Sequence, residues 1–272
     1  MTDHIEVFFD DIGNVLVYPE NFVNDVCGEA FWPIPFDNPI AKPESVKFPK
    51  PAWLIEASPV VEGFPLAVRR LQNFILCLSW DWLSNPEADY VFYAYASDVR
   101  RSIGNGADCG NQRLRKAFDQ LSSVDMVFPS FGNVSVSLLE VGGVSECGEY
   151  AFWKFKNELR LPLSDEYKWG MINMAESLKL TSKYALSLYE LARLYYRRKL
   201  NFRNTTPDEL RLLLGVGNSL PTWTALKGRA LEPAIKQIQD RTGLNIKFET
   251  ERRRRTREVN KITLTFSKQK AA

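Results

Sequence analysis

The 272-residue sequence predicts an α+β fold in which one order of elements, three helices and then a two-stranded hairpin, occurs twice. Apolar residues spaced three and four positions apart indicate the helices, and apolar–polar alternation indicates the strands. An acidic, proline-rich stretch precedes the first set. Because this order is typical of winged-helix domains, we predict two tandem winged-helix domains over 62–168 and 169–272, with an acidic, Pro-rich N-terminal extension over 1–61.

The N-terminal extension differs from the rest of the chain in its proline content. Nine of the fifteen prolines fall within residues 1–65. Proline removes a backbone hydrogen bond from a helix interior, so we expect no long helix there. Strands are expected near 5–9 and 14–18, followed by an irregular arm. The sequence leaves the role of the extension open between a partner-binding arm, a dimer element and a lid over a basic part of the chain.

The first predicted domain opens with a helix over 66–83, in which apolar residues recur at helical spacing. The following elements are expected to be a strand, two helices and two further strands, over 90–95, 97–103, 111–121, 134–139 and 150–155. A turn at Gly142 and Gly143 is expected to separate the last two strands, which would make them a hairpin.

The second predicted domain repeats this order. Helices are expected over 182–198, 206–214 and 226–241, and the middle one begins with Thr206-Pro207, an N-cap followed by proline at the first helical position. Two later runs alternate apolar and polar residues as half-buried strands do. Their apolar members are Leu244, Ile246 and Phe248, and then Ile262, Leu264 and Phe266.

The formal charge of +2 hides a strong asymmetry along the chain. Residues 1–60 carry 3 basic and 10 acidic side chains, residues 61–180 carry 12 and 15, and residues 181–272 carry 20 and 8. The last third therefore has a net charge of +12, against −10 for the first 180 residues. Such an asymmetry predicts a polyanionic partner.

The clearest candidate binding site is a run of basic residues in the loop between the last two predicted strands. Its members are Arg252, Arg253, Arg254, Arg255, Arg257 and Lys261. Five guanidiniums within six positions repel one another, and few acidic residues lie close enough in sequence to pair with them. Phosphates of a nucleic acid would neutralise them, which would make this hairpin the wing of the second domain. The alternative is a solvated charge run on an exposed loop.

The helix over 226–241 is predicted to have one apolar side and one side that could contact DNA. Candidate DNA-binding residues on or beside that second side are Lys227, Arg229, Lys236 and Gln237. A helix fits the major groove, where arginine can pair with guanine and glutamine with adenine. An ordinary surface helix is the alternative. Pro233 requires either that the helix begins near Glu232 or that it kinks there.

A weaker candidate lies in the first predicted domain. Gln112, Arg113, Arg115 and Lys116 decorate the helix that precedes the first hairpin. This helix could read a second groove or contact phosphates. A merely solvated face is the alternative, because this domain as a whole is slightly acidic.

Several classes of enzyme are excluded or disfavoured. The only histidine is His4, which excludes a Ser-His or Cys-His catalytic pair, and no P-loop motif occurs. Asp10 follows an apolar strand and looks like the nucleophile of haloacid-dehalogenase-type phosphatases. The alternating strand–helix pattern of their parallel sheet is, however, absent after residue 60. We therefore expect no enzyme and no cofactor, with the phosphatase as a remote alternative.

The four cysteines form no CxxC pair, so neither a disulfide framework nor a metal site is expected. The chain begins Met1-Thr2-Asp3 without a basic and apolar leader. No uncharged apolar run approaches the roughly 20 residues needed to span a bilayer. We expect a cytoplasmic protein without a membrane partner.

Two stretches of the last third, residues 180–191 (LTSKYALSLYEL) and 227–238 (KGRALEPAIKQI), carry a family resemblance. They are similar to the opening helix and the recognition helix of the second winged-helix domain in iteron-binding bacterial plasmid replication initiators of the RepB/RepA type. The loop over 252–257 and the strand over 262–266 resemble the family's basic wing and closing strand. Weaker similarity extends back to about residue 62, and the extension over 1–61 has no counterpart.

The resemblance implies a protein that binds directly repeated double-stranded DNA, the iterons of a plasmid origin, with both domains in successive major grooves. It implies origin opening, recruitment of the host replication initiator and helicase, and a homodimer that represses its own promoter. By position, Lys227, Arg229 and Lys236 would contact DNA, while Gly228 replaces a basic residue of some relatives. A winged-helix transcriptional repressor without a replication role is the alternative.

Overall fold

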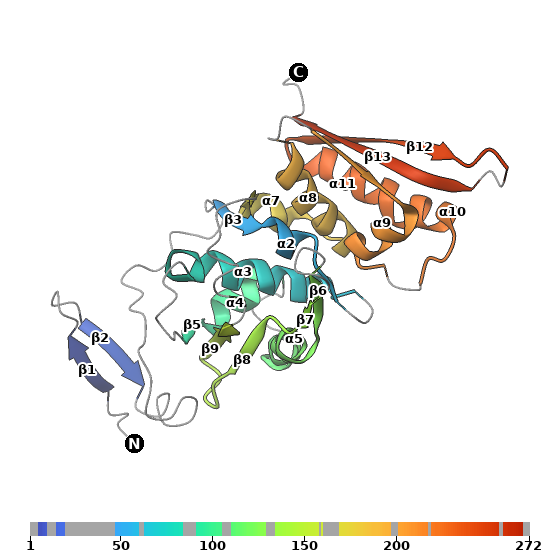
Figure 1. The fold of residues 1–272 in the computed structure, drawn as a ribbon. Helices are drawn as coiled ribbons and strands as arrows, with labels where there is room; N and C mark the ends of the chain where they lie inside the picture. The colour runs from blue at the N-terminus through green and yellow to red at the C-terminus, as the bar shows by residue number, and fades with distance from the viewer. Residues whose placement is uncertain are drawn as a thin grey trace.

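The computed structural model describes twelve ranges of the chain: residues 5–9, 15–19, 47–59, 63–83, 91–104, 110–128, 134–157, 159, 169–196, 201–216, 219–255 and 258–268. Helices and strands occur together, as predicted for an α+β chain (Figure 1). Every paired strand within these ranges runs antiparallel to its partner. None of the helices in the described ranges is long and apolar enough to cross a membrane.

The two strands predicted in the N-terminal extension form an antiparallel pair. β1 (Ile5–Phe9) lies beside β2 (Val15–Pro19), with Val7 opposite Val17. The second strand therefore begins one residue later than expected. Asp10, the candidate nucleophile of the phosphatase alternative, lies outside the described residues.

The first winged-helix module has three helices and an antiparallel sheet. Its helices are α3 (Leu66–Leu83), α4 (Ala96–Ser102) and α5 (Gln112–Ser123). Its sheet has the order β5–β9–β8, made of β5 (Phe92–Tyr95), β9 (Tyr150–Phe155) and β8 (Leu139–Val144). A smaller sheet joins β4 (Ser58–Pro59), β6 (Met126–Phe128) and β7 (Val134–Val136). The fully buried Trp153 ties α3 to the larger sheet, because its indole nitrogen donates to Oγ of Ser79 at 2.9 Å.

The turn predicted at Gly142 and Gly143 is wrong. Both glycines lie inside β8, and the chain reverses over 145–148, where the backbone N–H of Gly148 donates to the carbonyl of Ser145 at 3.0 Å. A Cβ on Gly142 would lie 2.7 Å from Cδ1 of Phe118 in α5. The glycine is needed because α5 packs directly onto the strand, so the glycine pair marks a close approach and not a reversal.

The second winged-helix module repeats the order. Its helices are α8 (Lys183–Tyr195), α9 (Pro207–Leu214) and a third that runs through α10 (Trp223–Leu226), the π-helical η3 (Lys227–Leu231) and α11 (Glu232–Arg241). Its sheet has the order β11–β13–β12, made of β11 (Phe202–Thr205), β13 (Val259–Lys268) and β12 (Leu244–Arg252). The sequence did not predict β11. The alternation predicted for the hairpin is confirmed, since Ile246, Ile262 and Leu264 are buried.

The predicted cap of α9 is confirmed. The side chain of Thr206 accepts from the N–H of Glu209 at 3.2 Å, and Oε2 of Glu209 accepts from the N–H of Thr206 at 3.0 Å. This capping box satisfies two backbone donors at the start of the helix. Gly215 ends the helix in the left-handed conformation, at φ 62°.

Residues 47–57 require a correction, because they were assigned to the N-terminal extension and instead lie in the core. β3 (Lys47–Pro51) pairs with β10 (Trp169–Asn173), and α2 (Ala52–Ile55) packs on α8. Phe48, Trp53 and Leu54 are all less than a tenth exposed. Proline disfavours a long helix, but it allows a short strand and a single helical turn, and the apolar residues between the prolines are buried.

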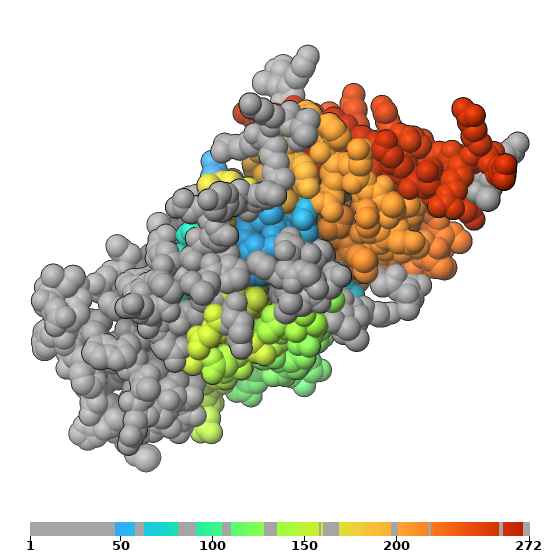
Figure 2. Space-filling model, in the orientation of Figure 1, coloured from blue at the N-terminus to red at the C-terminus, as the bar shows by residue number. Residues whose placement is uncertain are grey.

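One hydrophobic core runs through both modules. α3, which opens the first module, also contacts β3, α7 (Met174–Lys179) and α8 (Figure 1). Trp80 of α3 meets Trp169 of β10 edge-on, with ring centroids 4.7 Å apart. In Figure 2 the blue atoms of the segment 47–57 lie between the green first module and the orange second module. This segment and α3 therefore join the two halves of the molecule.

Candidate nucleic-acid interface

The third helix of the second module is continuous from Trp223 to Arg241 and contains one π-helical turn. The N–H of Glu232 donates to the carbonyl of Lys227, five residues earlier, which is the π spacing. Pro233 follows at once: it has no N–H to donate, and a wider turn relieves the clash between its ring and the preceding carbonyls. The sequence left open whether a helix begins near Glu232 or is distorted at Pro233. The structure shows a continuous helix that contains a π-helical turn before Pro233.

The apolar side of this helix is buried, as predicted. The five residues Ala230, Leu231, Ala234, Ile235 and Ile238 are at most 8% exposed. The opposite side exposes Arg229 and Lys236 to solvent. A Cβ placed on Gly228 would meet no atom within 4 Å, so the start of this side is open to a ligand.

Lys227 lies at the edge of the same surface and is half-buried. Its Nζ is 3.5 Å from Oε1 of Glu232 and 5.8 Å from the ring centroid of Phe248. An ion pair between partly exposed side chains contributes little to stability. The Lys227 ammonium can therefore exchange Glu232 for a phosphate at small cost.

Gln237, also predicted to contact DNA, is used inside the module. Its Oε1 accepts from the N–H of Thr181 at 3.0 Å and from that of Ser182 at 3.2 Å, and its Nε2 donates to Oγ1 of Thr181 at 2.8 Å. These bonds join α11 to the start of α8. The structure therefore gives Gln237 a structural role, because its side chain already has its hydrogen-bond partners.

The arginine run lies at the end of a long hairpin that extends past the helices (Figure 1). Arg252, Arg253, Arg254 and Arg255 are all exposed, whereas Arg257 lies outside the described residues. The pairing of β12 with β13 shifts between Glu251 and Arg252, and the N–H of Arg253 donates to the carbonyl of Glu258 at 2.9 Å. Lys261 pairs with Glu251 at 2.6 Å. The structure thus places at least four guanidiniums on a projecting wing, where phosphates can reach them.

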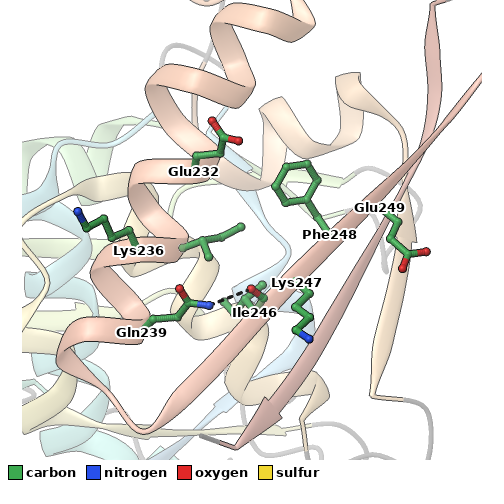
Figure 3. A pocket seen from close by; sticks show the side chains of 8 residues that line it. Glu232, Lys236, Gln239, Ile246, Lys247, Phe248 and Glu249 are labelled. Atoms are coloured by element: carbon green, nitrogen blue, oxygen red, sulfur yellow. Dashed lines mark hydrogen bonds between the residues drawn. The ribbon is translucent and has the colours of Figure 1, made fainter.

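A groove of about 390 Å³ separates α11 from β12 (Figure 3). Lys236 and Lys247 line it together with Glu232 and Glu249, so its walls carry no excess charge. Nε2 of Gln239 crosses its base and donates to the carbonyl of Ile246 at 3.3 Å. The excess positive charge therefore lies on the helix start and on the wing and not inside the groove.

The exposed Lys247 is a basic residue that the sequence analysis missed. Ile246 is buried and Phe248 half-buried, so the strand alternation directs Lys247 away from the core, at the rim of the groove. The alternation was read only for its apolar members, and reading its polar members would have found this lysine.

The weaker candidate surface belongs to α5 in the first module. Gln112, Arg113, Arg115 and Lys116 are exposed, opposite the buried Leu114, Ala117, Phe118 and Leu121. One guanidinium nitrogen of Arg115 donates to the carbonyl of Ser145 at 3.4 Å, which links the helix to the turn between β8 and β9, the wing of the first module. In Figure 1, α5 and the β12–β13 wing lie far apart. The structure therefore shows two separate basic surfaces, one on each module.

These features define a tandem winged-helix protein whose second module has an exposed basic helix and a basic wing. Residues 206–266 match the family described as initiator Rep protein, WH2. The fold is similar to that of a solved structure described as Pi initiator protein in complex with iteron DNA. That match has 20% sequence identity and a TM-score of 0.67, and it covers 84% of this chain and 99% of the other. The comparison with curated proteins gives no match.

Residues 206–266 are thus similar to the WH2 domain of initiator Rep proteins, and 84% of the chain has a fold similar to that of an initiator. The predicted resemblance to plasmid replication initiators is therefore confirmed. The matched residues include η3, α11 and the wing, which carry the exposed basic side chains Arg229, Lys236 and Arg252 to Arg255.

Proposed function

We propose that this protein is a plasmid replication initiator that binds the directly repeated double-stranded DNA of an origin. The observation that carries the proposal is the charge of the helix and wing of the second module. Residues 223–268 hold twelve basic and five acidic side chains, a net charge of +7. Arg229, Lys236 and the four wing arginines Arg252 to Arg255 are exposed to solvent, and the fold match to an initiator bound to iteron DNA supports the same partner.

The helix and the wing of the second module have different roles in binding DNA. Arg229 and Lys236 lie on a helix, which fits the major groove and can bring arginine to the acceptor edge of guanine. The wing arginines lie on a hairpin tip and bind backbone phosphates, which fixes orientation without reading sequence. α5 of the first module contacts a second stretch of the same repeat. The protein acts by binding, with no catalytic chemistry or cofactor of its own.

The later steps of initiation follow from this binding. We propose that repeat-bound copies promote opening of the neighbouring A·T-rich DNA and recruit the host initiator and helicase. As a homodimer the protein represses its own promoter. These steps need a cytoplasmic protein that meets the host's replication proteins on DNA.

A salt series tests the proposal most directly. If six to eight side chains neutralise phosphates, the logarithm of the association constant for origin repeats falls against log salt with a slope of about −5 to −7. The measurement is fluorescence anisotropy with a labelled repeat between low and physiological salt. A slope near zero would contradict a phosphate-based interface.

A winged-helix transcriptional repressor without a replication role remains the second candidate, because it would use the same helix and wing. A plasmid that carries the gene beside its repeats, in a host without another initiator for it, distinguishes the two. Replication of that plasmid supports the initiator. Failure to replicate, together with repression of a reporter from the gene's own promoter, supports the repressor.

The phosphatase alternative finds no support in the described residues, where all the paired strands are antiparallel and no parallel doubly wound sheet occurs. Magnesium-dependent phosphatase activity that Asp10→Asn abolishes would revive it.

A further inference from the structure

The polar side of α3 is buried between the two modules. Four polar residues of this helix, Arg69, Arg70, Gln72 and Asn73, are at most 8% exposed. Long polar side chains are rarely buried to this degree unless they have partners. The helix therefore has two buried sides, an apolar one in its own module and a polar one against the other.

The centre of this contact is an ion pair that comes from outside α3. Nζ of Lys50 in β3 lies 2.9 Å from Oε2 of Glu190 in α8, and each side chain is only 1% exposed. The same ammonium donates to Oδ1 of Asn73 at 2.8 Å and to Oε1 of Gln72 at 3.3 Å. Nδ2 of Asn73 donates to Oε1 of Glu190 at 2.7 Å. Three elements thus meet at one point, and all three ammonium hydrogens have acceptors.

Arg69 and Arg70 of α3 add to the polar contact between the modules. One terminal nitrogen of Arg70 donates to the carbonyls of Leu178 and Leu180, both at 2.8 Å, at the end of α7. The other donates to the carbonyl of Ile103 in the first module at 3.2 Å. Arg69 is buried close enough to Glu190 to feel its charge. Burial lowers the pKa of the Lys50 ammonium, and the Glu190 carboxylate opposes that shift.

Such a contact selects one arrangement of the modules more sharply than apolar packing does. Apolar contacts are non-directional and tolerate small rotations. A rotation here would separate Lys50 from Glu190 and leave charges buried without partners, which is strongly unfavourable. Buried polar contacts can specify register in this way even where they add little to stability.

We propose that the Lys50–Glu190 pair and its α3 partners Gln72 and Asn73 set the angle between the two winged-helix modules, and thereby the number of base pairs between the two DNA segments that the modules contact. This inference rests on the proposed function, because it assumes that both modules contact the same repeat. Lys50 and Glu190 are positioning residues: they lie away from the exposed basic surfaces and act through the placement of α5 and α11.

The test compares binding to the natural repeat with binding to a repeat that has one base pair inserted between the two contacted segments. One inserted pair rotates one segment against the other by about 35°. The full-length protein with a rigid joint must twist the DNA to bind, and we expect its affinity for the inserted repeat to fall about tenfold or more.

The decisive variant is Lys50→Met combined with Glu190→Gln, which makes the joint neutral. The new amide at position 190 can exchange hydrogen bonds with Asn73, so α3 and α8 keep a polar contact while the link to β3 is lost. We expect this variant to bind the natural repeat, and its affinity should fall less than about threefold when the base pair is inserted. A more flexible joint lets the modules rotate relative to each other, so the DNA has to twist less. The matched control is Lys154→Met with Glu140→Gln, a partly exposed pair 3.1 Å apart in the first module, which should keep the full spacing preference.

The outcomes separate the inference from the proposed function. A wild-type chain that binds neither repeat overturns the proposed function itself. A wild-type chain that prefers the natural spacing, with a double variant that prefers it equally, overturns the inference alone. If thermal melting shows the double variant unfolded, Gln72→Met carries the test. It removes the 3.3 Å contact with Lys50 and the weak 3.9 Å contact with Sδ of Met126, and it leaves the Lys50–Glu190 pair in place. Spacing preference unchanged in Gln72→Met would then overturn the inference, and a reduced preference supports it.

Discussion

The two modules share an order of elements but differ in charge. In the second module, the helix and wing over 223–268 carry a net charge of +7, whereas in the first module residues 110–155 hold four basic and five acidic side chains, a net charge of −1. Both place a helix beside a hairpin of antiparallel strands. The fold therefore places a helix beside a hairpin in both modules, and only the side chains decide the charge of each surface.

The wings show the same contrast. The strands of the second wing, β12 and β13, have nine and ten residues and end in four exposed arginines. Those of the first wing, β8 and β9, have six residues each and are joined by a tight turn. Tyr95 of β5 and Tyr150 of β9 stack on each other where these two strands pair, with ring centroids 5.4 Å apart. We infer that the second module supplies most of the affinity for DNA, while the first module fixes the position of the protein along the DNA.

The largest expected effect comes from the second wing. Changing Arg252, Arg253, Arg254 and Arg255 together to Ala should weaken binding to all DNA by about 100-fold and make the salt slope less steep by about 3 to 4. Folding should be unaffected, because these side chains are exposed. Anisotropy with specific and random duplexes measures both quantities. An equally large loss of affinity on changing the basic residues of the first module would contradict the inference that the second module supplies most of it.

The next effect concerns sequence preference. Arg229→Ala should reduce the ratio of specific to non-specific affinity by about 10-fold to 100-fold, since we propose that this arginine reads a base. The change in salt slope should be about 1 or less. Competition binding with the natural repeat and a scrambled duplex measures the ratio, and Arg253→Ala is the control that should leave the ratio unchanged. If Arg229→Ala weakens both duplexes equally, the division between helix and wing is wrong.

A smaller effect is expected in the first module. Changing Arg113, Arg115 and Lys116 together to Ala should weaken binding by less than about tenfold, because the neighbouring acidic residues already reduce the potential at α5. The loss should be greater on the natural repeat than on a half-length duplex that only the second module covers. Equal losses on the two duplexes would show that α5 contacts no separate DNA segment.

The smallest effect distinguishes a structural residue from a reading one. Gln237→Ala should lower the free energy of unfolding by about 1 kcal/mol, since it removes the acceptor for two backbone donors at the start of α8. The ratio of specific to non-specific affinity should stay unchanged. Chemical denaturation and competition binding measure the two quantities. A reduced ratio of specific to non-specific affinity, with an unchanged free energy of unfolding, would show that Gln237 contacts DNA.

Elements with strong local patterns were predictable from the sequence. The spacing of apolar residues predicted α3 with both of its ends, and Thr206-Pro207 predicted the start of α9. The buried side of α11 also followed from helical spacing, because its partners are apolar wherever they come from. The exposed basic residues of the second module are predictable for the same reason, since they occupy the positions that the core does not use.

Elements that depend on distant partners were not predictable. β3 is a strand because β10 lies beside it, and the proline content of its own sequence suggests an irregular arm. Gln72 and Asn73 look like solvent-facing residues of α3 until Lys50 and Glu190 are placed against them. Gly142 reads as a turn residue until α5 packs on it. In each case the missing information is a contact between segments far apart in the sequence.

The π-helical turn over 227–231 has a consequence for the direction of an exposed basic side chain. Such a turn holds one residue more than the α-helical path would need. Deleting one residue there would return the helix to regular α spacing and change the direction of Arg229, which lies inside the turn. The half of the helix after Pro233 would stay fixed by Ala234, Ile235 and Ile238. A single-residue deletion would therefore move Arg229 relative to Lys236 and leave the core beyond Pro233 intact.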